Sequence, residues 1–180
     1  MFSTEEELTA VSRARLKVQD LARGCGWLDA VLRQQDRVLH ALDAFEDRRD
    51  AVAWTRMRQA VQALFRVEEV VLAPAILAQG LRAHVVVAEM SRHRILRDID
   101  DLRSSSRGDA GPHMHGLRTL LVSHFTQEEG DSYRALARQL DERRNAALTA
   151  RCLGELAGIG EALDESAAGD GRLAVATPDA

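Results

Sequence analysis

Apolar residues recur at intervals of three and four positions over most of the chain, and only three prolines interrupt it. This spacing gathers apolar side chains on one face of an α-helix, whereas a half-buried strand needs strict alternation of apolar and polar residues. Sustained alternation of that kind is absent from the sequence. Ala, Leu, Arg and Glu are abundant, and these residues have high helix propensity. The pattern therefore predicts an all-α protein.

The periodic segments predict helices at about 4–22, 27–45, 50–77, 81–103, 112–140 and 143–164. Glycine-rich or charged segments separate them, namely 24–26, 46–50 and 104–111. Pro74 is expected to kink or end the third helix, because it lacks a backbone N–H, and Gly80 suits the stop. Short connections of this kind favour antiparallel packing of neighbouring helices.

A chain of 180 residues is long enough for one domain with a hydrophobic core and short for two. We expect a helical N-terminal extension at 1–24 and a bundle of four antiparallel helices at 25–142. A C-terminal helix should follow at 143–165. The sequence from Ser166 onward is small and polar, so residues 166–180 are expected to be a disordered tail.

Charge and composition argue against several classes of protein. The net charge is −4 and no basic tract occurs, so binding to nucleic acid is not expected. A membrane span would need an apolar run of roughly 18–20 residues, and none is present. The acidic first residues do not resemble a signal peptide, and Cys25 and Cys152 show no C-x-x-C spacing, which favours a cytoplasmic protein with reduced thiols. The common catalytic and nucleotide-binding motifs are also missing, which argues against an enzyme.

Some ionisable residues fall on the apolar faces of the predicted helices. Glu68 lies four residues after Leu64, and His124 lies three residues after Leu121. Glu128 follows His124 by one helical turn, so the two side chains share a face. Burying an ionised carboxylate costs several kcal/mol unless it is paired, hydrogen-bonded or bound to a metal.

Two further helices carry polar groups in similar positions. Glu89 and His93 are one turn apart in the segment 81–103, and Gln35 and Asp36 lie in the middle of the apolar stripe of the segment 27–45. Metal sites in helix bundles are built from carboxylates and imidazoles that converge from facing helices. Mixed oxygen and nitrogen ligands suit iron, manganese or zinc. The candidate metal ligands are Asp36, Glu68, Glu89, His93, His124 and Glu128.

Each candidate also has an interpretation without a metal. A single His-x-x-x-Glu pair is common on helices. Glu68 could pair with an arginine such as Arg92 or Arg94, and His93 could be a histidine at the edge of the core with one hydrogen-bond partner. Neighbouring acids, Glu69 and Glu129, are expected on the solvated face.

Three segments resemble the hemerythrin-like (HHE cation-binding) family. Its pattern His-x-x-x-Glu-Glu-x-x-hydrophobic-x-Pro-Ala is similar to residues 64–75, LFRVEEVVLAPA. Its third-helix histidine region is similar to residues 91–96, SRHRIL, and its second His-x-x-x-Glu motif to residues 124–129, HFTQEE. The similarity covers about residues 27–140. It implies an antiparallel up-down four-helix bundle with a nonheme di-iron centre, and it places ligands at Glu68, His93, His124 and Glu128.

The chain departs from that pattern at two ligand positions. Leu64 stands where the family has its second-helix histidine, and Gln35 or Asp36 stands where it has its first-helix histidine. Leucine cannot bind a metal, whereas Asp36 and Glu89 could supply oxygen ligands. Reversible oxygen binding, which relies on a histidine-rich iron in the family, is therefore not expected.

Two functions remain open on this basis. The first is a bundle with a partly lost ligand set that binds one or two nonheme iron ions in iron, oxygen or redox sensing or handling. The second is a metal-free helical scaffold that acts through a protein partner or by homo-oligomerisation. The sequence does not distinguish them.

Overall fold

The computed structural model describes residue 18 and residues 20–104 and 110–170, and this part of the chain is helical, with no strand. The all-α prediction is confirmed for these residues. Most of the predicted helix 4–22 lies outside them, as do residues 171–180 of the predicted tail. The helices are α2 (Gly26–Arg48), α3 (Ala51–Val67), η1 (Glu68–Leu72), α4 (Ala73–Ala78), α5 (Arg82–Ser104), α6 (Ala110–Gln127), η2 (Glu128–Tyr133), α7 (Arg134–Gln139) and α8 (Glu142–Asp170).

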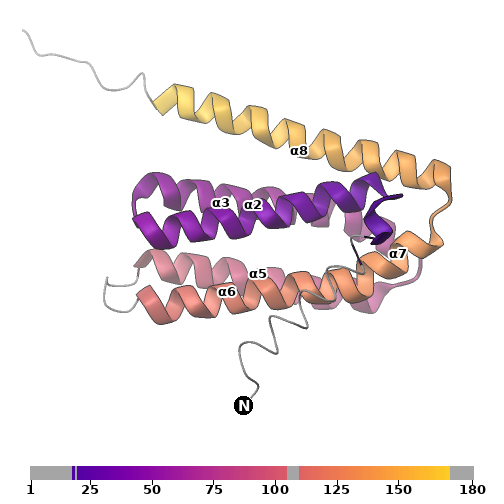
Figure 1. The fold of residues 1–180 in the computed structure, drawn as a ribbon, viewed down its shortest axis with the longest axis horizontal. Helices are drawn as coiled ribbons and strands as arrows, with labels where there is room; N and C mark the ends of the chain where they lie inside the picture. The colour runs from indigo at the N-terminus through magenta and orange to yellow at the C-terminus, as the bar shows by residue number, and fades with distance from the viewer. Residues whose placement is uncertain (1–17, 19, 105–109, 171–180) are drawn as a thin grey trace, which may run out of the picture.

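The helices pack as two antiparallel pairs with a further helix on one side (Figure 1). α2 packs against α3, and α5 packs against α6. α8 lies along the outer side of α2 and α3, away from α5 and α6. The space between the two pairs holds the hydrophobic core, whose largest fully buried side chains include Trp27, Leu28, Leu42, Met57, Leu64, Ile95, Leu117 and Leu121.

The turns follow the local chemistry of the sequence. The side chain of Asp50 accepts a hydrogen bond from the backbone N–H of Ala53 at 2.6 Å, which caps the first turn of α3. Gly80 has φ +77° in the turn between α4 and α5, a conformation that glycine adopts without steric cost. Gly80 thus ends the helix as predicted.

Pro74 does not end its helix, contrary to one of the two outcomes predicted for it. α3, η1 and α4 form one continuous helical segment, in which η1 is a π-turn whose backbone hydrogen bond runs from Ala73 N–H to Glu68 O. Pro74 has no N–H to offer the carbonyl of Val70, four residues earlier. The guanidinium of Arg151 on α8 donates to that carbonyl at 3.2 Å instead.

α8 is held against the start of α2 by close polar contacts. Thr149 Oγ1 accepts a hydrogen bond from Trp27 N at 3.0 Å, and Asn145 Nδ2 donates to Gly24 O at 2.8 Å. A Cβ atom at Gly26 would lie 2.7 Å from Thr149 Cγ2, so only glycine allows this approach. α8 continues to Asp170, beyond the predicted end of the helix at 164 and into the segment predicted to be disordered.

Candidate functional site

A buried carboxylate, Glu68, accepts three hydrogen bonds from side chains of other segments. Its Oε2 atom is 3.1 Å from Nε2 of His124 and 3.3 Å from Nη1 of Arg92. Its Oε1 atom accepts a hydrogen bond from the hydroxyl of Tyr133 at 3.0 Å. Both oxygens of this carboxylate are therefore engaged. We call Glu68, Arg92, His124 and Tyr133 the Glu68 cluster.

The cluster joins four helical elements from three regions of the sequence, since α6 and η2 are consecutive. Glu68 begins η1, Arg92 lies in α5, His124 lies near the end of α6, and Tyr133 ends η2. Aromatic side chains enclose it, since the ring of Phe65 packs edge-on against His124 at 5.5 Å and that of Trp27 against Tyr133 at 5.9 Å. This apolar surrounding strengthens every charge interaction inside the cluster.

The charges of Glu68 and His124 stabilise each other. Burial acts to raise the pKa of Glu68, but the charges of His124 and Arg92 and the hydrogen bonds to the carboxylate outweigh it and hold that pKa below its ordinary value. Burial likewise acts to lower the pKa of His124, yet the carboxylate of Glu68 raises it above its ordinary value. Because an ionised carboxylate only accepts hydrogen bonds, Nε2 of His124 carries a proton directed at Glu68.

A second buried carboxylate, Glu128, has much weaker support. Among the residues that the structure describes, its carboxylate accepts one side-chain hydrogen bond, from Ser132 Oγ at 3.4 Å. Burial, followed by the negative charge of Glu68, raises the pKa of Glu128 to about 7. Arg92 and His124 act in the opposite direction but do not compensate. Glu128 is therefore close to half protonated at neutral pH.

The structure brings together three of the six predicted ligands. Glu68 and His124 are in direct contact, and Glu128 is buried close enough for its charge to act on both. The other three, Asp36, Glu89 and His93, have exposed side chains. The ring of His93 donates through Nδ1 to the backbone carbonyl of Glu89 at 3.0 Å, so it is held against its own helix. Their role as ligands stays a prediction.

The two departures from the hemerythrin-like pattern are both buried. Leu64 is 0% exposed and packs in the core. Gln35, and not Asp36, is the inward residue of α2, also at 0% exposed. Neither amide atom of the Gln35 side chain has a hydrogen-bond partner among the residues that the structure describes. Such a group costs free energy in the folded state.

A metal centre of the implied kind does not fit this arrangement. In the described part of the chain, no group of three or more His, Cys, Asp or Glu side chains is arranged to hold a metal ion. The guanidinium of Arg92 is permanently charged and lies 3.3 Å from Oε2 of Glu68. It would repel a metal cation bound to that oxygen. Leu64 offers no ligand atom, and Gln35 offers only a weak neutral oxygen in place of an imidazole.

Several buried residues with polar side chains were not among the predicted site residues, and three of them lie in η2. Tyr133 lies five residues after Glu128, and residues at that spacing do not share one face of an α-helix. The π-turn η2 closes its backbone hydrogen bonds at i+5, so Tyr133 comes onto the inward face. Ser132 and Glu129 are buried in the same turn, and the expectation that Glu129 is solvated is wrong. Gly130, inside the predicted helix 112–140, is the sequence signal of an irregularity in this turn.

A hollow of about 260 Å³ at the surface leads towards the cluster. It lies between η1 and α5, and Arg92 and Phe65 line it together with Glu69, Glu89 and His93. The exposed candidates Glu89 and His93 therefore border the same hollow as Arg92. Among the described residues, the helices are too short or too polar to cross a lipid bilayer.

Comparisons with protein-family models, with curated proteins and with solved structures find no match for this chain.

Proposed function

We propose that this chain is a metal-free helical scaffold in which the Glu68 cluster takes the place of a metal centre, and that it acts through protein contacts. The proposal includes the finer architecture implied by the resemblance, a hemerythrin-like four-helix bundle. Its four helices would be α2, the segment α3–η1–α4, α5, and the segment α6–η2–α7. α8 would be an addition to that bundle.

The contact of an arginine and a histidine with one buried carboxylate is the observation that carries this proposal. Arg92 and His124 both reach Oε2 of Glu68, and all three side chains are about nine-tenths buried or more. A metal bridged by Glu68 would have to displace them and would then leave buried positive charges without a partner. An internal ion pair supplies the same neutralisation without a metal.

Replacement of ligands by core residues supports the same view. Leu64 fills its position with apolar volume. Without a metal centre, we expect the chain to function through contacts of its surface with other proteins. α5 offers a candidate surface, because Val86, Val87 and Met90 are apolar and exposed.

A metal-binding bundle is the second candidate, and one observation favours it. Glu68, His124 and Glu128 are all buried, and Glu128 has few partners for its charge. A bound iron ion would balance the negative charge of Glu128. In this reading the chain would sense or handle iron, oxygen or redox state with a reduced ligand set.

Metal analysis separates the two candidates. Protein purified without chelator is analysed for iron, manganese and zinc, and its melting temperature is measured with and without a chelator. We expect less than about one metal ion per ten chains and an unchanged melting temperature, because a ligand stabilises only the state that binds it. Stoichiometric metal that is lost in His124→Ala but kept in the exposed control His115→Ala would establish the second candidate instead.

A further inference from the structure

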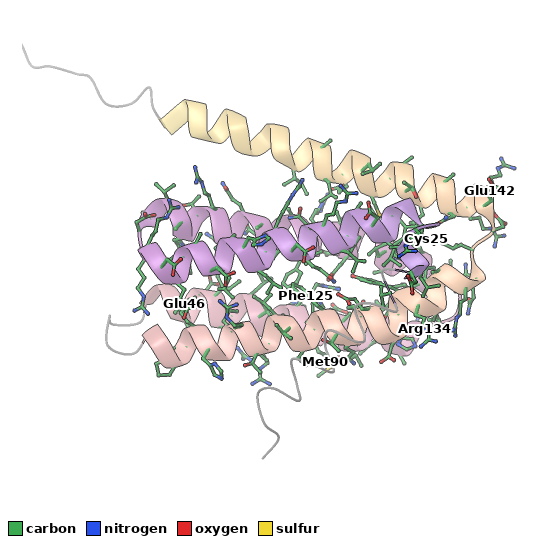
Figure 2. All side chains as sticks on the ribbon, in the orientation of Figure 1. Cys25, Glu46, Met90, Phe125, Arg134 and Glu142 are labelled. Atoms are coloured by element: carbon green, nitrogen blue, oxygen red, sulfur yellow. The ribbon has the colours of Figure 1, made fainter. Side chains whose placement is uncertain are left out.

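An apolar strip lies on the outer face of the first half of α5. Val86 is 49% exposed, Val87 is 42% exposed and Met90 is 69% exposed, and we call these three residues the α5 strip. In Figure 2, Met90 lies at the edge of the α5–α6 pair that is turned away from α8. The other large apolar side chains that are exposed in the described ranges lie singly on other helices. A contiguous group of this kind marks a contact site more often than scattered residues do.

The exposed charges of α5 change sign between its two ends. Arg82 is exposed at the first position of the helix, and Asp100 is exposed near its end. The two residues are 18 positions apart, which is five turns of an α-helix, so they lie on one line along its surface. A cation at the start of a helix and an anion near its end both oppose the dipole of that helix. The stability of α5 alone therefore does not explain this arrangement.

Two antiparallel copies of α5 are complementary in charge. When Arg82 of one copy lies opposite Asp100 of the second copy, the twofold axis passes through residue 91 and the same contact is made twice. Met90, the most exposed residue of the strip, then lies next to that axis and meets Met90 of the second copy. The register that pairs the charges thus also places the apolar strip at the centre of the contact.

The residues beside the strip fit the same register. Val86 comes opposite the exposed Arg97 of the second copy, whose aliphatic stem can cover it. Glu89 comes opposite His93 of the second copy. Because Nδ1 of His93 is engaged by a carbonyl of its own helix, Nε2 is the ring atom left for a contact with another molecule. The face therefore matches itself in both charge and apolar surface.

We propose that two copies of this chain dimerise through their α5 helices, which pack antiparallel with the α5 strips in contact. This inference rests on the proposed function, because it names the partner in the protein contact as a second copy of the chain. Three apolar residues per chain form a small interface core, so we expect a dissociation constant on the order of 10 µM.

Sedimentation equilibrium of the full chain, between about 5 and about 200 µM, measures this association. Met90→Glu places like charges next to the twofold axis and should raise the dissociation constant at least about tenfold. Leu153→Glu is the matched control, since Leu153 is 52% exposed on α8, and it should leave the dissociation constant unchanged.

A charge exchange tests the register. Arg82→Glu and Asp100→Arg each place like charges opposite one another, and each should raise the dissociation constant several-fold. An equimolar mixture of the two variants should associate about as tightly as the wild type. The reason is that every charge pair of the mixed dimer again joins opposite signs.

Three results would overturn the proposal. They are a monomer at the highest concentration, a dimer that Met90→Glu leaves intact, and a mixture that associates no more tightly than its components. A monomeric chain without metal would contradict the dimer alone. A dimer with stoichiometric metal would contradict the metal-free scaffold alone, so the two failures are distinguished.

Discussion

The two π-turns of the molecule start alike and differ in what surrounds them. η1 and η2 each begin with two consecutive glutamates, and the first of each pair, Glu68 or Glu128, is buried. Glu68 contacts a guanidinium, an imidazole and a tyrosine hydroxyl, whereas Glu128 accepts one long hydrogen bond from Ser132. The pKa of Glu68 is lowered and that of Glu128 is raised to about 7. Two similar motifs thus shift the pKa values of their buried carboxyl groups in opposite directions.

The two glutamates therefore differ in how strongly neighbouring groups stabilise the ionised form of the carboxyl group. Arg92 and His124 contact Glu68 directly, whereas burial and the charge of Glu68 raise the pKa of Glu128. In a metal centre both carboxylates would instead be ionised towards a shared cation. Experiments that compare Glu68 with Glu128 therefore test the metal-free interpretation most directly.

Removing one charge at a time should give the largest contrast. Glu68→Gln leaves Arg92 and His124 buried without their anion, and we expect it to lower the free energy of unfolding by about 3–5 kcal/mol. Glu128→Gln at about pH 5 should change it by less than about 1 kcal/mol, because the amide replaces a carboxyl group that is largely protonated in the folded state at that pH. Urea unfolding of both variants measures the difference. Equal losses would show that the two sites are equivalent.

Stability should also fall as the pH rises through neutrality. The folded-state pKa of Glu128 is raised to about 7, above its value in the unfolded chain. Its contribution is therefore fully present below its ordinary pKa and is lost as the pH rises through about 7. We expect a loss on the order of 2 kcal/mol between about pH 5 and about pH 8. The raised pKa of His124 acts in the same direction, so the Glu128→Gln variant should keep only part of this slope.

The smallest effect concerns the backbone of η2. A Cβ atom at Gly130 meets nothing within 4 Å, and the same holds for Gly116 in α6. Alanine at either position should stabilise the protein by about 0.5–1 kcal/mol, because glycine loses more backbone entropy on folding. Thermal unfolding of both variants compares them. A loss at Gly130 together with a gain at Gly116 would mean that the π-turn needs its glycine.

The sequence predicted the helices well because their apolar spacing is regular, and it identified Glu68, His124 and Glu128 as inward residues. It favoured His93 over Arg92 on α5, although adjacent residues point about 100° apart and a long arginine side chain can reach inward from the edge of a stripe. It missed Tyr133 and Glu129 because α-helical spacing does not apply within a π-turn. Hydrogen-bond irregularities of this kind depend on tertiary contacts that periodicity does not encode.

Titration of the two carboxyl groups in one sample tests the central claim most directly. Carboxyl carbons of the glutamates are followed by NMR as the pH is varied, with Glu68→Gln and Glu128→Gln used to assign the two signals. We predict that the carboxyl group of Glu68 stays ionised at pH values below its ordinary pKa and that Glu128 titrates at about 7. Titration of both carboxyl groups together near their ordinary value would contradict this prediction, and so would an added divalent metal ion that kept Glu128 ionised at about pH 6.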